Sequence, residues 1–109
     1  MHELGITRNI VAIVTEHARG ARVKRVGLEI GKLSAIMPDA IRFCFDVCAK
    51  STPLEDAELT IAEIAGLGCC ENCGENVALE QLFGRCACGS RQIRCIAGEE
   101  MKIKEMELF

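Results

Sequence analysis

The stretch GCCENCGENVALEQLFGRCACGSRQIRCIAG, residues 68–98, decides how this chain is organised. It holds six of the eight cysteines, and two of its segments, CENCG and CACG, end in Cys-Gly. Two cysteines this close together can grip one metal ion from a tight turn, and the glycine after them lets the backbone turn sharply. The stretch has too few apolar side chains to bury a core, so metal–thiolate bonds must supply its folding energy. It therefore predicts a module that folds around zinc.

The predicted zinc ligands are the two cysteines of each segment: Cys70, Cys73, Cys86 and Cys88. The first pair has Cys-x-x-Cys spacing, whereas the second is Cys-x-Cys, because Arg85 stands where a strict mirror would place a cysteine. Cys95 or Cys69 stays open as a replacement for Cys86. Four thiolates leave no open position for water or substrate, so the zinc is expected to be structural. A redox dithiol is the alternative, but six cysteines in two glycine-followed halves favour metal.

Hydrophobic periodicity predicts two helices and two strands before the module. Apolar residues recur at helical steps over residues 4–19, and a second helix begins near Pro38 and stops at residues 51–53, Ser-Thr-Pro. The apolar stripe of the first helix comprises Ile6, Ile10, Ile13, Val14 and His17. That of the second comprises Ile41, Cys44, Phe45 and Cys48. Alternating apolar residues predict strands at 22–32 and 57–65.

A last strand is predicted after the module, where Met101 and Ile103 alternate with charged residues. The alternation slips by one residue between Ile103 and Met106, as at a β-bulge. The order strand, helix, strand in the first half suits a βαβ crossover. We therefore predict an α+β fold in which a small sheet of about three strands packs with two helices. A zinc-ribbon-like module, residues 66–98, is inserted into an α/β domain formed by residues 1–65 and 99–109.

Charge and composition disfavour several classes of function. The net charge is −3, and the module itself has three glutamates against three arginines. A nucleic-acid-binding zinc ribbon, the main competing hypothesis, would need a basic face and stacking aromatics. A thiol redox enzyme would need an accessible cysteine of low pKa. No apolar run approaches the roughly 18 residues of a membrane span, and the start lacks a secretory signal, so we expect a cytoplasmic protein without membrane insertion.

The start of the chain, Met-His-Glu, has the composition of a terminal chelate. A free α-amine has a pKa near 8 and loses its proton readily to a metal. The backbone amides of His2 and Glu3 are then placed to close small chelate rings, and the imidazole of His2 completes a nitrogen-rich square. Such planar nitrogen donors suit Ni(II) or Cu(II) rather than Zn(II). The other histidine, His17, is expected to be packed or hydrogen-bonded, and Cys44 and Cys48 are expected in the core.

The segments together resemble one family over essentially the whole chain. They are MHELGITRNI at the start, VGLEIGKLSAIMPDAIRFCFDV and PLEDAELTI in the middle, CENCG and CGS in the module, and GEEMKIKEMEL at the end. In this order they resemble the HypA family of hydrogenase nickel-incorporation proteins. The Cys-Ala-Cys of the second knuckle departs from that family's usual Cys-x-x-Cys, which leaves Cys95 as a reserve for Cys86.

The resemblance implies a cytoplasmic metallochaperone rather than an enzyme. Its cargo is expected to be Ni(II), bound at Met1, His2 and Glu3, and a structural Zn(II) is expected on four cysteines in a separate lobe. The expected partners are a HypB-type GTPase and the large subunit of [NiFe]-hydrogenase, and in some bacteria the urease maturation system. We expect a monomer or weak homodimer that binds no nucleic acid.

Overall fold

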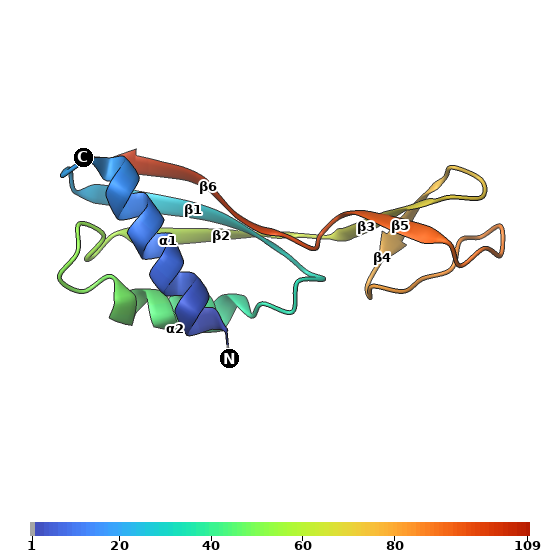
Figure 1. Ribbon diagram of the computed structural model, residues 1–109, viewed down its shortest axis with the longest axis horizontal. Coiled ribbons are helices and arrows are strands. Elements are labelled where there is room, and N and C mark those ends of the chain that lie inside the picture. The colour runs from blue at the N-terminus through green and yellow to red at the C-terminus, as the bar shows by residue number, and fades with distance from the viewer. Residues whose placement is uncertain (1) are drawn as a thin grey trace. The chain divides into compact units, whose positions relative to one another are not determined.

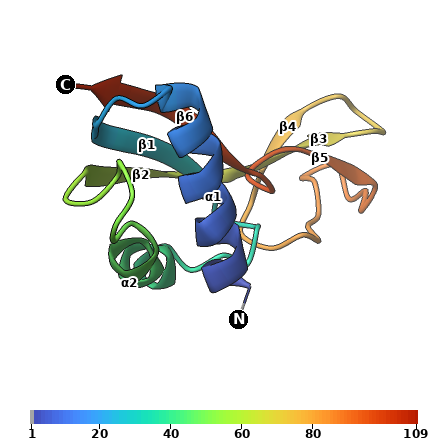
Figure 2. The ribbon, with the colours of Figure 1, turned by 60° about the vertical axis from the view of Figure 1, so that its left-hand side comes forward.

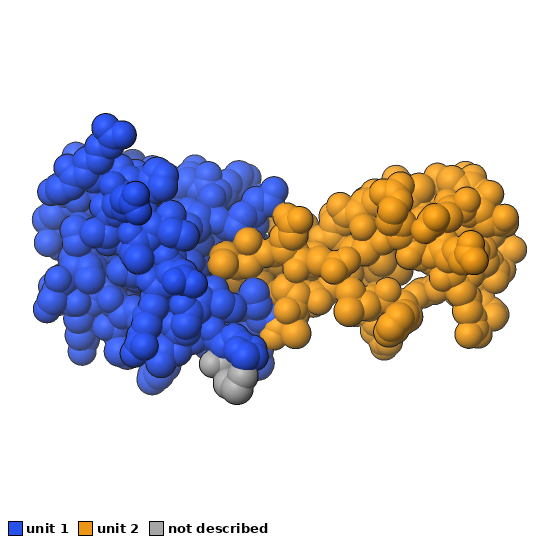
Figure 3. Space-filling view, in the orientation of Figure 1, with its two compact units in different colours: residues 1–29, 36–62, 102–109 blue, residues 30–35, 63–101 orange. Residues whose placement is uncertain are grey.

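A computed structural model describes residues 2–109, so any prediction about Met1 lies outside the described residues. The chain divides into two compact units, coloured separately in Figure 3. One comprises residues 1–29, 36–62 and 102–109, and the other comprises residues 30–35 and 63–101. In the part of the chain that is described, no helix is both long and apolar enough to cross a membrane.

Two helices and one three-stranded sheet form the α/β part of the fold. The elements are α1 (Glu3–Ala18), β1 (Val23–Gly31), α2 (Pro38–Cys48), β2 (Glu58–Ile64) and β6 (Met101–Leu108). Each lies within two residues of its predicted position. The strand order is β2-β1-β6. Figure 1 shows β1 and β2 running in the same direction and β6 running back, so the predicted crossover from β1 through α2 to β2 is present.

The helix boundaries follow from local backbone chemistry. Arg19 takes a left-handed conformation (φ 51°) after α1, and Gly20 follows at φ 86°, so the helix cannot continue. Met37 is extended (φ −91°, ψ 116°), as expected for a residue that precedes proline. Pro38 then starts α2, where its missing N–H has no helical acceptor to lose.

The core of this unit is aliphatic and lies where α1 packs against α2 and covers one face of the sheet (Figures 1 and 2). Its buried side chains from the helices are Ile10, Val11, Val14, Ala18, Ile41 and Phe45, and those from β1 are Val23, Val26, Leu28 and Ile30. The predicted stripe of α1 was wrong at two positions. Ile13 is 45% exposed and His17 is exposed, because Thr7, Val11 and Ala18 occupy the buried face instead.

The other face of the sheet carries charged side chains in cross-strand pairs. Lys104 Nζ lies 3.4 Å from Glu29 of β1, while Arg25 of β1 lies 3.9 Å from Glu105 and 3.2 Å from Glu107. Glu29 and Arg25 share one face of β1, because they are four residues apart on a strand. The consecutive residues Lys104 and Glu105 therefore both point to that face. This agrees with the slip in alternation expected from the sequence.

The second unit contains a small antiparallel sheet of order β4-β3-β5. Its strands are β3 (Gly66–Cys70), β4 (Asn76–Leu79) and β5 (Ile93–Ala97). β3 pairs with β4 from Gly66 opposite Leu79 to Cys69 opposite Asn76, and with β5 through a register shift at Leu67 and Gly68. These strands are not predicted by the sequence pattern, because glycines and cysteines replace the alternating apolar residues that mark a strand.

Glycines at the base of the module allow close approach of three chain segments. A methyl group on Gly31 would overlap the carbonyl group of Gly98, and one on Gly98 would lie 2.6 Å from the Cα atom of Gly66. Hydrogen bonds join the same segments, from Gly31 N–H to Glu100 O (2.8 Å) and from Leu33 N–H to Gly98 O (2.8 Å). Any side chain at these glycines would force the segments apart.

Candidate metal centres

Four cysteine sulfurs gather at the end of the module, and their residues are Cys70, Cys73, Cys86 and Cys88. All four Sγ atoms lie within 4.8 Å of one another. Cys70 ends β3, whereas the other three lie in the turns after β3 and before β5. Cys70 and Cys86 are buried, and Cys73 and Cys88 are exposed. The structure thus brings together the same four cysteines that the sequence singled out, and their binding of zinc stays a prediction.

The spacing of these sulfurs fits a tetrahedral zinc ion. Four sulfurs at about 2.3 Å from a common centre are separated by about 3.8 Å. The Sγ atoms of Cys70 and Cys88 are 3.7 Å apart, and those of Cys73 and Cys86 are 3.5 Å apart. A site of four thiolates and no further ligand is closed to water and substrate, which suits a structural role.

The two cysteine turns have matching hydrogen bonds despite their different spacings. In the first turn, Gly74 N–H donates to Cys70 O (2.8 Å), which closes a turn of five residues. In the second, Gly89 N–H donates to Cys86 O (2.8 Å), which closes a turn of four residues. The first cysteine of each turn also donates its own N–H to the residue after the glycine, Glu75 O or Ser90 O (both 2.9 Å). The Cys-x-Cys spacing therefore makes a shorter turn that still presents both sulfurs.

The glycine in each turn is required by its backbone conformation. Gly74 has φ 80° and Gly89 has φ 97°, in the region that residues with a Cβ rarely adopt. A methyl group at either position would meet nothing within 4 Å, so the requirement comes from φ and not from crowding. This supports the interpretation of the Cys-Gly pairs as turn signals.

Backbone N–H groups that face the sulfurs stabilise thiolates. The N–H of Cys73 lowers the pKa of Cys70; burial opposes this, but the N–H of Asn72 adds to it, and the pKa falls to about 6. The pKa of Cys88 is also lowered, first by the N–H of Ser90 and then by the side-chain amide of Asn72, whose Nδ2 lies 3.6 Å from the Cys88 sulfur. Donors of this kind favour the charged, metal-binding form.

The pKa of Cys73 shifts in the opposite direction, upward. The N–H of Glu75 favours its thiolate, but the adjacent thiol of Cys86, burial and Cys70 together raise the pKa of Cys73 to about 12. Sulfurs so close together cannot all carry a negative charge without a cation among them. The cluster therefore gains its four thiolates only with a bound ion.

Neither reserve cysteine joins the cluster. The thiol of Cys95 on β5 lies 3.3 Å from Ala97 O, and the side chain of Glu99, with burial, raises its pKa. The side chain of Glu99 and burial therefore favour the protonated thiol of Cys95, although the backbone of Ala97 acts in the opposite direction. Cys69 points to the carbonyl groups of Cys70 (3.9 Å) and Gly74 (3.7 Å) instead. The geometry therefore favours Cys86 over both alternatives.

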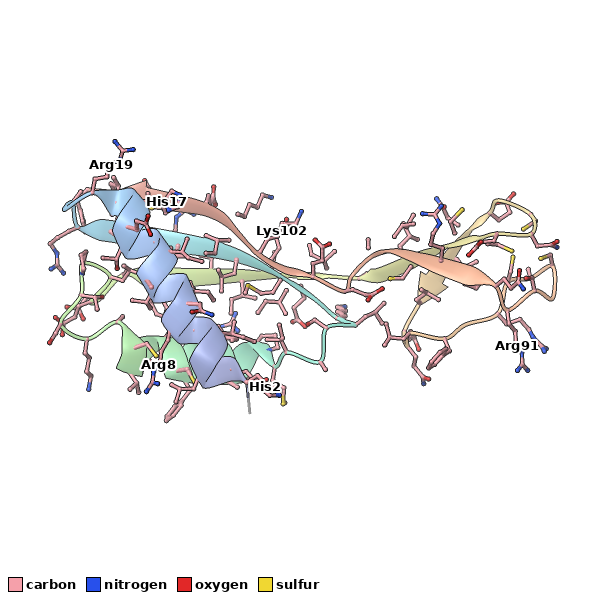
Figure 4. All side chains as sticks on the ribbon, viewed as in Figure 1. His2, Arg8, His17, Arg19, Arg91 and Lys102 are labelled. Carbon is pink, nitrogen blue, oxygen red and sulfur yellow. The ribbon has the colours of Figure 1, made fainter. Side chains whose placement is uncertain are left out.

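The second candidate centre is the start of α1. His2 is exposed and caps the helix, and its carbonyl accepts the first helical hydrogen bond, from Ile6 N–H (2.9 Å). Figure 4 shows the His2 side chain at this end of α1. The first N–H groups of an α-helix have no acceptor within the helix, so the first turn of α1 depends on partners outside the helical hydrogen bonds. Met1, the third residue predicted here, lies outside the described residues.

Glu3 is held by the fold rather than projecting into solvent. It is 9% exposed, and its Oε2 accepts a hydrogen bond from the backbone N–H of Met37, 3.2 Å away, just before α2. Its carbonyl accepts the hydroxyl of the fully buried Thr7 (2.6 Å). These contacts anchor the first turn of α1, and sequence reasoning missed Met37 and Thr7 because neither lies in a metal-binding pattern.

The other histidine and the two cysteines of α2 do not belong to a group of potential metal ligands among the described residues. His17 Nδ1 lies 2.8 Å from Ile13 O in the same helix, a local hydrogen bond of the expected kind. Cys44 and Cys48 are half-buried on α2 and belong to no group of three or more potential ligands among residues 2–109.

The chain matches known proteins along its whole length. The family model described as "Hydrogenase/urease nickel incorporation, metallochaperone, hypA" matches residues 1–108. A "Hydrogenase maturation factor HypA" of Nostoc punctiforme is 67% identical over 108 residues, covering 99% of this chain and 96% of the relative. One from Geobacter metallireducens is 45% identical over 109 residues, covering 99% of each. The "Solution structure of the Ni metallochaperone HypA from Helicobacter pylori" has a TM-score of 0.72 and 26% identity, covering 99% of this chain and 97% of that one.

Proposed function

Because this chain belongs to the HypA family, the nickel metallochaperones of hydrogenase maturation, we propose that it binds Ni(II) at its amino terminus and delivers it to a hydrogenase large subunit. The family consists of maturation factors and not enzymes, so the nickel is cargo that is handed on. The observation that carries the proposal is the exposed side chain of His2, which lies at the N-cap position of α1 next to the start of the chain.

In the proposed nickel site, the ligands are the α-amine of Met1, the backbone nitrogens of His2 and Glu3, and the His2 imidazole. This nitrogen-rich set suits Ni(II) in a planar geometry. The carboxylate of Glu3 has a different task in this proposal, because its hydrogen bond to Met37 N–H holds the first helical turn in place. A chain end is also a suitable donor, since it can be approached by an acceptor protein from several sides.

The second ion in the proposal is a resident Zn(II) on Cys70, Cys73, Cys86 and Cys88, which folds the module and takes no part in transfer. The fit of the four sulfurs to a tetrahedral ion supports it. We propose that residues 66–98 act as this zinc-binding module and that residues 1–65 and 99–109 act as the nickel-binding domain.

A HypB-type GTPase is the proposed partner in nickel delivery, and urease maturation proteins are proposed as further partners where the host has that enzyme. The description of the family as one of hydrogenase and urease nickel incorporation supports both kinds of target. The proposed compartment is the cytoplasm, which suits eight cysteines that are all free of disulfides.

The decisive experiment compares nickel binding by the wild-type chain and His2→Ala, with zinc counted in both. We expect His2→Ala to lose nickel binding and to keep one zinc per chain, because the two sites share no ligand. His17→Ala is the matched control, since it removes the other histidine outside the proposed site. Unchanged nickel affinity in His2→Ala would refute the proposal.

Two further measurements test the terminal amine and the imidazole. A chain with one extra residue ahead of Met1 keeps every side chain but displaces the α-amine, so it should bind nickel more weakly than the native chain. Nickel affinity should also fall between pH 7.5 and pH 5.5, because the α-amine and the imidazole must both be deprotonated to bind the metal, and protons compete for both nitrogens at lower pH. Equal affinities in either comparison would count against this ligand set.

A further inference from the structure

Strand β6 forms one of the two edges of the main sheet. In the order β2-β1-β6, β6 pairs with β1 and nothing among residues 2–109 pairs with its other edge. Such an edge presents a row of free N–H and C=O groups that a further strand can pair with. The side chains of β6 determine which strand can pair with this edge.

The sequence of β6 is complementary to itself when read in reverse. Residues 102–107 read Lys-Ile-Lys-Glu-Met-Glu. In an antiparallel pair of two such strands, Lys102 lies opposite Glu107, Ile103 opposite Met106, and Lys104 opposite Glu105. Every pair then joins opposite charges or two apolar side chains, and the twofold axis repeats each of them. Cross-strand pairs of these two kinds stabilise a sheet, whereas like charges destabilise it.

The slip at Lys104 and Glu105 is what makes this register geometrically possible. In a regular strand, Ile103 and Met106 would face opposite sides of the sheet and could not meet across a twofold axis. Here Lys104 and Glu105 are both exposed and both reach side chains on the charged face of β1, Glu29 and Arg25. Ile103 and Met106 therefore share the opposite face, where both are half-buried.

Neighbouring registers lack this match. A shift by one residue in one direction sets Lys104 against Lys104 of the second copy, and in the other direction sets Glu105 against Glu105. Each shift also places apolar side chains opposite charged ones. Only one register therefore satisfies the whole strand, as expected for a specific interface.

The apolar face of this edge has room for a partner. A groove of about 250 Å³ lies between α1 and β6, lined by Ile13, Val14 and His17 of the helix and by residues 103–106 of the strand. Figure 4 shows His17 on the last turn of α1, at the β6 side of the sheet. Ile13 is 45% exposed here, and His17, one helical turn further along, is exposed as well. An added strand would place its own Ile103 and Met106 beside this groove and cover Ile13.

We propose that two copies of this chain associate through their β6 strands, in antiparallel register with Lys104 opposite Glu105, to form one continuous six-stranded sheet. The interface is isologous, because each copy supplies the same strand and the same groove. The charged pairs lie on one face of the new sheet, and the apolar pairs lie on the other, beside α1.

Sedimentation equilibrium of the zinc-loaded chain provides the test. We expect the wild type to dimerise reversibly at concentrations up to about 1 mM, the weak end of specific association. Lys102→Glu sets glutamate against Glu107 at two symmetric places, so its dimer Kd should rise about tenfold or more. Lys50→Glu is the matched control, since it makes the same change in net charge at an exposed position after α2 and should leave Kd unchanged.

Mixing complementary variants makes the test specific for this register. Lys102→Glu alone and Glu107→Lys alone should each be mostly monomeric, whereas a mixture should form a heterodimer in which both cross-strand pairs again join opposite charges. If Glu107→Lys is poorly folded because it loses the ion pairs with Arg25 and Lys24, the dimer Kd of Lys102→Glu is measured at low and high salt instead. Salt screens the repulsion from Glu107, so the ratio of this Kd to that of Lys50→Glu should fall as salt rises. A monomeric wild type, a Lys102→Glu dimer as tight as that of Lys50→Glu, or a mixture without heterodimer would each overturn the proposal.

Discussion

Replacing Cys86 by serine is the sharpest test of how the module binds zinc. Cys86 is 4% exposed, and its sulfur lies 3.5 Å from that of Cys73. The substitution removes one of four thiolates from a nearly fixed position and leaves a hydroxyl, a much poorer zinc ligand. The backbone turn is not perturbed, because the hydrogen bonds from Cys86 N–H to Ser90 O and from Gly89 N–H to Cys86 O involve no side chain.

The expected loss of zinc affinity can be calculated from the part of the binding free energy that one ligand contributes. Structural zinc sites contribute about 10–16 kcal/mol of binding free energy, so an even share for each of four ligands is about 3 kcal/mol. That loss corresponds to roughly a hundredfold increase in the zinc Kd. The exposed ligands Cys73 and Cys88 should show losses of the same order, since all four sulfurs would contact the same ion.

The assay is competition for zinc with a chromophoric chelator, which reports the zinc Kd and the number of ions per chain. Cys95→Ser is the matched control, because it removes a cysteine of the same module whose thiol lies by Ala97 O and outside the cluster. We expect Cys95→Ser to bind zinc as tightly as the wild type. Retention of wild-type affinity by Cys86→Ser, with a loss in Cys95→Ser, would refute the assignment and show that the Cys-x-Cys pair is not the ligand pair.

Further predictions concern the base of the module and the protons that zinc displaces. Gly31→Ala should destabilise the zinc-loaded protein by at least about 2 kcal/mol in chemical denaturation, because the methyl group would overlap the backbone of Gly98. Gly5→Ala in α1 meets nothing within 4 Å and should instead stabilise it by roughly 0.5–1 kcal/mol; equal effects would contradict the packing argument. Zinc binding at pH 7.5 should release a proton from Cys73 (pKa about 12) but none from Cys70 (pKa about 6), and affinity should fall steeply below pH 6, where Cys70 must also lose a proton. Calorimetric titration in two buffers of different ionisation enthalpy measures this release, and its absence would refute the pKa order.

The parts of this fold that could be predicted from the sequence are those with a strong local signal. The helices and the strands of the main sheet follow from apolar periodicity, and Pro38 marks the start of α2 because its φ suits a first turn. The strands of the module could not be predicted in the same way. Their pairing depends on the close approach of Gly66 and Gly68 to neighbouring strands, and a glycine has no side chain to indicate which face of a strand is buried.

Residues whose role depends on another segment were also beyond the sequence. The buried face of α1 includes Glu3 and Thr7, which no hydrophobic pattern would select, because Glu3 is held by the backbone of Met37 on a different element. Ile13 fits the apolar stripe and yet is exposed, because it lines the open groove between α1 and β6. Periodicity identifies a helix but not which of its neighbours is present to bury it.

The second cysteine turn illustrates what a departure from a motif means physically. A ligand pair must place two sulfurs about 3.8 Å apart around the same ion, and the number of residues between them is only a means to that end. Here the second turn is one residue shorter than the first, so its closing hydrogen bond spans four residues instead of five, while Gly89 keeps the positive φ that Gly74 has in the first turn. The glycine after the cysteine is therefore a better guide to a ligand turn than the spacing of the cysteines. On that argument, converting Gly89 to alanine should weaken zinc binding even though all four sulfurs remain.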